Sequence, residues 1–335
     1  MNKKKFTRCE EIYPRIYKIM LPLAGEKPGP VNVYFLPGAV PTLIDTGTAR
    51  SAEVLKTALE SLGFGFGDIE QIILTHGHLD HYGAARKIST AAGGSAAIAA
   101  HEDDRVLIER GFEAPKSVFK NFYRIMGAPL IFQISLLAVE KIFRSMAQTC
   151  RVTRTIKDGD TIRIGDYRAR VVSTPGHTRG SVCLFMESES VMFTGDLILG
   201  HITPNAFVML EPDFELPVRL SQEEFYDSLG RVEKLAPRLI LPAHGAIITD
   251  LKETVSMYRS QFGLRQERIL SILNDHEYTV YRTARILFPD IGGARLPLEI
   301  YLAISEVYTH LQVLQKLGRV ESREVHGALR FVSKK

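Results

Sequence analysis

Cysteine is scarce in this 335-residue sequence, which contains only Cys9, Cys150 and Cys183, all far apart. No CxxC pair occurs, so a cysteine-rich zinc finger is excluded and a framework of disulfide bonds is not expected. Long apolar runs are missing as well. The longest, residues 128–139, is interrupted by polar side chains and is shorter than the roughly 20 residues that a membrane-spanning helix needs.

Several local signatures are also absent. The basic start of the chain, with lysines at 3–5, is not followed by the apolar stretch of a secretory signal peptide. The sequence has neither a P-loop motif nor the GxSxG of serine hydrolases. The glycine-rich stretch 63–67 precedes a predicted strand, so it does not match a dinucleotide-binding turn. We therefore expect a soluble, reduced, cytoplasmic protein with no membrane partner.

The composition is that of an ordinary folded protein. Apolar residues make up 45% and charged residues 24%, which excludes a disordered chain or a fibre. The 42 basic residues exceed the 38 acidic ones by only four, an excess that permits an anionic partner without arguing for one. The length predicts about two domains.

Hydrophobic patterns in the first half alternate between strand and helix. Apolar runs at 31–36 and 42–45, separated by a Pro-Gly pair, predict a β-hairpin. Helical spacing at 51–62 and strands at 69–74 and 95–100 follow, and β patterns resume between 161 and 194. This order predicts an α/β (α+β) fold. Residues 105–150 form an aromatic-rich helical insertion, which we expect to break near 127–129. A lid or pocket wall over the site is the favoured role, ahead of a dimer interface or extra core.

The last 75 residues have a different pattern. Helical segments at 265–273, 280–287 and 296–317 precede a hairpin at 319–332, which is the order of a small winged-helix domain. We therefore predict a catalytic domain at 1–260 and a winged-helix-like domain at 261–335. Residues 262–335 contain eleven Lys and Arg against eight Asp and Glu, which is a weak excess for nucleic-acid binding. A packing or dimerisation role is favoured over DNA binding.

The densest group of chemically active residues is His76-Gly77-His78-Leu79-Asp80-His81, directly after the strand pattern 71–75. Four such side chains within six residues cannot point the same way on a strand or a helix, but on a loop they can converge. Neutral imidazoles and carboxylates suit Zn(II), Mn(II) or Fe(II). The run therefore predicts a metal site.

Three later motifs carry the same kind of side chain. His177 lies in Thr-Pro-Gly-His-Thr, Asp196 ends Phe-Thr-Gly-Asp, and His244 lies in Leu-Pro-Ala-His-Gly. Each comes directly after a predicted strand, where a rigid sheet can hold side chains around a common point.

Together these motifs resemble the metallo-β-lactamase superfamily over residues 12–258. The ordered set HxHxDH, His, Asp and His matches, and so does the segment Leu43-Ile44-Asp45-Thr46-Gly47. The resemblance implies an αββα sandwich with a dinuclear metal site, most simply zinc, at one sheet edge. It assigns His76, His78 and His177 to one metal, Asp80, His81 and His244 to the other, and Asp196 to both. It also implies that Asp45 supports the ligand loop through hydrogen bonds.

The resemblance implies a hydrolase in which a hydroxide shared by two cations attacks a small ester-like substrate such as a thioester or lactone. Asp80 could then accept a proton and pass it to the leaving group. Thr178 and His201 are expected beside the metals or the substrate. Two observations argue against a β-lactamase proper. Asp196 stands where resistance β-lactamases commonly have cysteine, and the sequence shows no signal peptide.

Three other functions stay open at this point. A similar tail occurs in a single-strand-specific endoribonuclease of the superfamily, so RNA is a possible partner. Sulfur dioxygenases share most of the ligand positions and use one iron. A DNA-binding regulator with a sensing metal domain is a fourth possibility, which the weak basic charge disfavours. A homodimer is also possible.

Overall fold

The computed structural model describes residues 8–23, 28–111, 116–132, 147–204, 206, 208, 219–274, 276–291 and 296–334. The chain forms two compact units. The first comprises Met1–Phe112, Phe143–Pro204 and Ser228–Thr254, and the second comprises Glu113–Ile142, Asn205–Asp227 and Val255–Lys335. The expected boundary near 260 lies inside a single helix, α8 (Leu251–Leu273). The division into domains at 1–260 and 261–335 stays a prediction.

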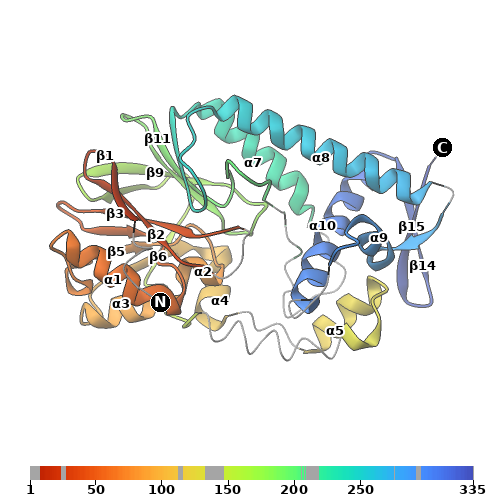
Figure 1. Cartoon of the computed structure of the whole chain (residues 1–335), viewed down its shortest axis with the longest axis horizontal. Helices are drawn as coiled ribbons and strands as arrows, with labels where there is room; N and C mark the ends of the chain where they lie inside the picture. The colour runs from red at the N-terminus through yellow and green to blue at the C-terminus, as the bar shows by residue number, and fades with distance from the viewer. Residues whose placement is uncertain are drawn as a thin grey trace. The chain divides into compact units, whose positions relative to one another are not determined.

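The first unit contains two sheets (Figure 1). One has seven strands in sequential order: β1 (Arg8–Tyr13), β2 (Ile16–Leu21), β3 (Val31–Leu36), β4 (Thr42–Ile44), β5 (Gln71–Ile73), β6 (Ala97–His101) and β7 (Arg154–Ile156). Its first four strands pair antiparallel and its last four pair parallel. The β3–β4 pairing confirms the predicted hairpin.

The second sheet has five strands in the order β12-β11-β10-β9-β8. These are β8 (Thr161–Ile164), β9 (Tyr167–Ser173), β10 (Val182–Met186), β11 (Val191–Gly195) and β12 (Leu239–Pro242). All its pairs are antiparallel except β11–β12, which is parallel. The strands β9, β11 and β12 each end one residue later than the sequence predicted, directly before the segments that contain His177, Asp196 and His244.

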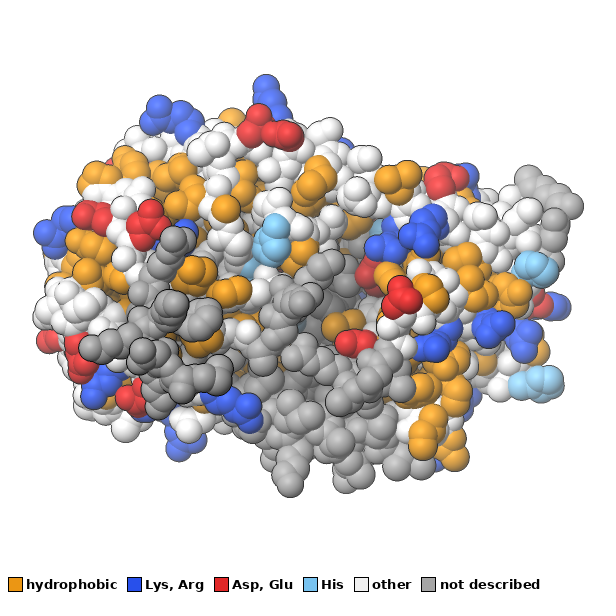
Figure 2. All heavy atoms as spheres, in the orientation of Figure 1, with side chains coloured by type: hydrophobic (Ala, Val, Ile, Leu, Met, Phe, Trp, Pro, Cys, Tyr) orange, Lys and Arg blue, Asp and Glu red, His pale blue; other side chains and the backbone are white. Residues whose placement is uncertain are grey.

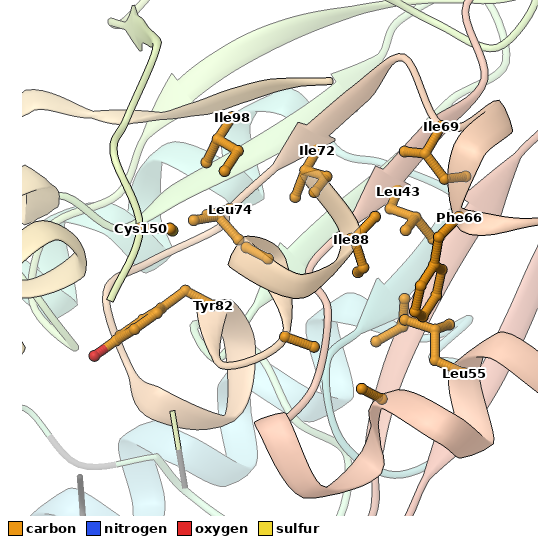
Figure 3. Close-up of a cluster of buried hydrophobic side chains, with 14 of the residues drawn as sticks. Leu43, Leu55, Phe66, Ile69, Ile72, Leu74, Tyr82, Ile88, Ile98 and Cys150 are labelled. Carbon is orange, nitrogen blue, oxygen red and sulfur yellow. The ribbon is translucent and has the colours of Figure 1, made fainter. Parts of the chain in front are cut away.

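Strand residues of the seven-stranded sheet alternate between two apolar cores. Tyr34, Ile44 and Ile73 face the core shared with the five-stranded sheet. Leu43 and Ile72, one position away, face the helices on the other side, as Figure 3 shows. Those helices are α1 (Ala52–Ser61), α2 (Leu79–Tyr82), α3 (Ala85–Ala91) and α4 (Glu102–Arg110).

The end of α7 (Ser221–Leu235) contacts the end of β9 and the turn that follows it. Ser228 donates a hydrogen bond to the Pro175 carbonyl, and Arg231 donates one to the Ser173 carbonyl. Within the first unit, the two sheets therefore share one core, and helices pack on the outer face of the seven-stranded sheet. This is a mixed α/β sandwich, as the sequence predicted.

The second unit contains helices and a three-stranded sheet. Its elements are α5 (Lys116–Ile125), parts of α7 and α8, β13 (Tyr278–Thr279), α9 (Val280–Leu287), α10 (Leu296–Lys316), β14 (Val320–Val325) and β15 (Ala328–Ser333). The sheet order is β13-β15-β14, and both pairs are antiparallel. The predicted hairpin at 319–332 is confirmed.

Two predicted segments differ in extent. The helix expected at 265–273 begins earlier, at Leu251, because Val255, Tyr258 and Phe262 continue its buried face. The insertion 105–150 is described only in part. Helix α5 ends at Ile125 and helical residues resume at Leu130, so the predicted break near 127–129 is confirmed. Residues 112–115 and 133–146 lie outside the described residues, and the lid or interface role stays a prediction.

None of the described helices is both long and apolar enough to cross a membrane.

A buried histidine in α10 makes the second unit sensitive to acid. His310 is 1% exposed, its Nδ1 has no hydrogen-bond partner, and burial, aided by Arg265, lowers its pKa to about 3. An unfolded chain protonates this ring below a pH of about 6.5, whereas the folded chain does not. The contribution of His310 to stability is therefore complete above that pH and is lost progressively below it.

We expect His310→Gln to flatten this dependence. Between pH 6.5 and pH 5, the free energy of unfolding of the wild type should fall by about 2 kcal/mol more than that of the variant. Urea unfolding of the full chain at both pH values measures the difference, with His276→Gln, an exposed histidine, as control. Equal slopes for wild type and His310→Gln would rule out His310 as the titrating group.

Candidate metal centre

The HxHxDH run divides between a loop and a short helix. Strand β5 ends at Ile73, the two residues His76 and His78 lie on the loop that follows, and Asp80 and His81 lie on α2. The sequence predicted a loop for the whole run. The structure differs from this prediction by one turn of helix at Leu79–Tyr82, which points the adjacent side chains of Asp80 and His81 in different directions.

The structure brings together the seven residues that the sequence singled out. The ligand atoms of His76, His78 and His177, here called the first cluster, lie within 4.8 Å of one another. Those of Asp80, His81 and His244, the second cluster, do the same. A third group of His76, His81 and Asp196 satisfies the same criterion and links the two clusters.

Asp196 lies between the clusters. Its Oδ2 is 3.5 Å from His177 Nε2, and its Oδ1 is 3.7 Å from His81 Nε2 and 3.6 Å from His244 Nε2. One carboxylate therefore presents one oxygen to each cluster. This is the arrangement that a bridging ligand requires.

Four buried polar atoms at this point have no hydrogen-bond partner: the Nε2 atoms of His76, His81 and His244, and Asp196 Oδ1. Buried polar atoms in folded proteins are almost always paired, because an unpaired one costs free energy. All four belong to residues of the two clusters or to the carboxylate between them. Nitrogen and oxygen donors of this kind fit a divalent cation such as zinc.

Hydrogen bonds from behind fix the imidazole rings. His81 Nδ1 donates to Asp45 Oδ2 at 2.9 Å, and His244 Nδ1 donates to the Pro30 carbonyl at 3.0 Å. Thr75 Oγ1 donates to Asp45 Oδ2 and therefore accepts from His76 Nδ1, 3.1 Å away. Each bond keeps the proton on Nδ1 and leaves Nε2 free to bind a metal.

Asp45 is thus the residue behind both clusters. It also accepts the Thr75 backbone N–H at 2.8 Å and has a φ of 60°, a strained value for a residue other than glycine. The sequence predicted a supporting role for Asp45, and the bonds to His81 and Thr75 provide one.

The two clusters differ in charge. Burial lowers the pKa of His76 and His78, aided by the neighbouring histidines, and brings that of His78 to about 3. Burial also opposes charge on His81 and His244, yet the carboxylates around them outweigh it and raise the pKa of both rings.

The carboxyl groups show the matching shifts. Burial raises the pKa of Asp80, but His81 and His244 outweigh it and bring it to about 2. Burial likewise opposes ionisation of Asp196, and His244 and His81 hold its pKa well below the usual range. Both carboxylates are therefore ionised at neutral pH.

Two predicted neighbours of the site have structural partners. Thr178 Oγ1 donates to Asp104 Oδ2 at 2.6 Å, and His201 Nε2 is hydrogen-bonded to the Pro28 carbonyl at 2.8 Å. These bonds order the loops after β9 and β11. His101 ends β6 and caps α4 by accepting the Asp103 N–H.

Sequence reasoning missed three supporting residues. Asn32 donates to the carbonyls of Pro242 and Gly245 on either side of His244, and Tyr34 donates to Pro242 as well. Asp104 is buried under the loops of the first cluster. Asn32 and Tyr34 lie in an apolar strand pattern. Asp104 follows two acidic residues at a helix start, a pattern that the helix dipole alone explains. Neither the strand pattern nor the acidic helix start therefore indicates that these residues support the site.

Comparison with known proteins gives a consistent result. The family model "Metallo-beta-lactamase superfamily" matches residues 27–244. The probable metallo-hydrolase YqjP of Bacillus subtilis (strain 168) is 29% identical over 293 residues, 86% of this chain and 88% of that protein. An atrochrysone carboxyl ACP thioesterase of Aspergillus fumigatus is 25% identical over 297 residues, 87% of this chain and 73% of that protein.

Among solved structures, a metallo-beta-lactamase family protein from Thermus thermophilus matches with a TM-score of 0.82. It is 26% identical, and the match covers 97% of this chain and all of that one.

Proposed function

Since the chain belongs to the metallo-β-lactamase superfamily and is a hydrolase of that family, we propose that it cleaves a small ester-like substrate, a thioester, lactone or related acyl compound. Two divalent cations would be held by the two clusters, with Asp196 between them. The observation that carries the proposal is Asp196, whose two oxygens face different clusters across a set of unpaired buried donors.

Cations bound there would supply Lewis acidity, which lowers the pKa of water and polarises the attacked carbonyl group. The protein's own part is to hold the seven side chains on the loops and the short helix that follow strand ends, and to keep the protons of His76, His81 and His244 on Nδ1. The Asp80 side chain is 19% exposed, whereas that of Asp196 is 9% exposed, so Asp80 is the more accessible of these two carboxylates. Being ionised at neutral pH, Asp80 could take up a proton at Oδ1 or Oδ2 and return it to the leaving group.

The metal content tests this proposal. Elemental analysis of protein purified without added metal should give about two zinc or manganese ions per chain. One iron per chain, with oxygen consumption on persulfides, would replace the hydrolase by a sulfur dioxygenase. A protein that binds no metal at neutral pH would contradict both the hydrolase and the dioxygenase.

The substrate class draws support from one relative. The Aspergillus fumigatus protein is named an atrochrysone carboxyl ACP thioesterase, and the match covers most of both chains. A panel of acyl thioesters, lactones and single-stranded RNA should give turnover on a thioester or a lactone and none on RNA.

We infer that residues 261–335 form a winged-helix domain. The order of helices followed by the β14–β15 hairpin, with β13 as third strand, supports this. Two basic side chains of the hairpin region are already paired: Arg319 with Glu267 at 2.8 Å, and Arg323 with Glu277 through two hydrogen bonds. On the face drawn in Figure 2, basic and acidic side chains are interspersed. These observations favour a packing role over nucleic-acid binding.

A further inference from the structure

Asp104 is a buried carboxylate outside the seven ligands. It lies on α4 and is 1% exposed. Its Oδ2 accepts the Gly77 N–H at 2.7 Å and the Thr178 hydroxyl at 2.6 Å, and its Oδ1 accepts the Gly180 N–H at 2.8 Å. A buried charge is costly unless it is hydrogen-bonded, and here three donors come from only two loops.

Those two loops carry the first cluster. Gly77 stands between His76 and His78, and Thr178 directly follows His177. Asp104 therefore holds the backbone on both sides of the first cluster. Its three hydrogen bonds reach no residue of the second cluster.

The two glycines allow this close approach. A Cβ on Gly180 would lie 2.6 Å from the Asp104 backbone nitrogen and 2.7 Å from its carboxyl carbon. A Cβ on Gly77 would lie 3.0 Å from Leu107 Cβ and 3.3 Å from Asp104 Cβ. Both loops are thus packed directly on α4, with room for no side chain in between.

We propose that Asp104 is a positioning residue for the first cluster: by tying the His76–His78 loop to the His177 loop, it sets the spacing of three imidazoles before a cation binds. The inference rests on the proposed function in so far as the first cluster binds a metal. Such preorganisation acts on one site of the two, which separates it from a general contribution to folding.

Asp104→Asn tests the proposal. The asparagine keeps the shape but turns an NH₂ group toward backbone N–H donors. We expect zinc affinity at the first cluster to fall about 10- to 100-fold, the range for lost supporting hydrogen bonds, with the second cluster unchanged. Competition titration with a chromophoric chelator resolves the two sites. Asp158→Asn is the control, because that carboxylate lies in the same unit and its hydrogen bonds go to Arg231 and Ser173, not to the loops of the clusters, so both affinities should be retained.

A conservative pair supports the test in case Asp104→Asn fails to fold. Thr178→Val removes one of the three hydrogen bonds and should lower the zinc affinity of the first cluster by a smaller factor. Thr178→Ser keeps the hydroxyl and should retain the wild-type affinity. Amide hydrogen exchange on the metal-free chain gives a readout independent of metal. Exchange at Gly77 and Gly180 should be faster in Asp104→Asn than in the wild type.

Wild-type zinc affinities in both Asp104→Asn and Thr178→Val, or equal losses at the two clusters, would overturn the role of Asp104. A wild type that binds no zinc would instead overturn the proposed function. In that case the exchange rates at Gly77 and Gly180 still decide whether Asp104 ties the two loops together.

Discussion

Replacing His244 with alanine should reduce hydrolysis about 1000-fold and lower the bound metal from two ions to about one per chain. His244 Nε2 lies 3.5 Å from Asp80 Oδ2 and 3.6 Å from Asp196 Oδ1, so its loss opens the second cluster and leaves the first intact. Losing one of two cations removes several kcal/mol of transition-state stabilisation, which corresponds to about that rate factor. Steady-state kinetics and elemental analysis on one preparation measure both effects.

The same substitution separates the two enzyme classes. A dioxygenase with one iron in the first cluster would retain its iron and much of its activity in His244→Ala. His201→Ala serves as control, since it removes a nearby histidine whose ring is hydrogen-bonded to the Pro28 carbonyl. Its metal content should stay at two. A His244→Ala variant with full metal and full activity would refute the dinuclear proposal.

Replacing Asp45 with asparagine should weaken both sites together. An NH₂ group at the Oδ2 position cannot accept the His81 Nδ1–H or the Thr75 hydroxyl proton. Both rings then lose the bond that keeps their proton on Nδ1, directly for His81 and through Thr75 for His76. A proton on Nε2 blocks metal binding, so we expect zinc affinity at each cluster to fall about 10- to 100-fold.

Zinc titration combined with NMR of the histidine ring nitrogens measures this effect. The spectra distinguish the two tautomers and should show His81 and His76 changing form in Asp45→Asn. Asp104→Asn provides the contrast, because it should weaken one site and leave both tautomers unchanged. Unchanged tautomers in Asp45→Asn would contradict the hydrogen-bond relay through Thr75.

The convergence of the candidate ligands could be predicted from the sequence because each follows a strand pattern that is easy to recognise. The strands that precede His177 and His244 end at the same edge of the sandwich, so the residues directly after them converge there. The supporting residues could not be predicted in this way. The role of Asp104 depends on α4 lying under two loops from different sheets, a contact that no local pattern encodes.

The same limit applies to Asn32, which supports the turn around His244 from a distant part of the chain. Its neighbours make an apolar strand, and its amide bonds form only once β3 lies beside the turn after β12. Local patterns also missed the helical turn at Leu79–Tyr82, since four residues are too few for a periodic signal.

Each cluster takes its members from both sheets. His76, His78, Asp80 and His81 follow β5 of the seven-stranded sheet, whereas His177 and His244 follow β9 and β12 of the five-stranded one. A cation in either cluster would therefore cross-link the two sheets of the sandwich. At a free metal concentration 100 times its Kd, one bound cation adds about 2.7 kcal/mol to the free energy of unfolding. Metal starvation in the cell would thus shorten the lifetime of the protein, because proteases act on the unfolded fraction.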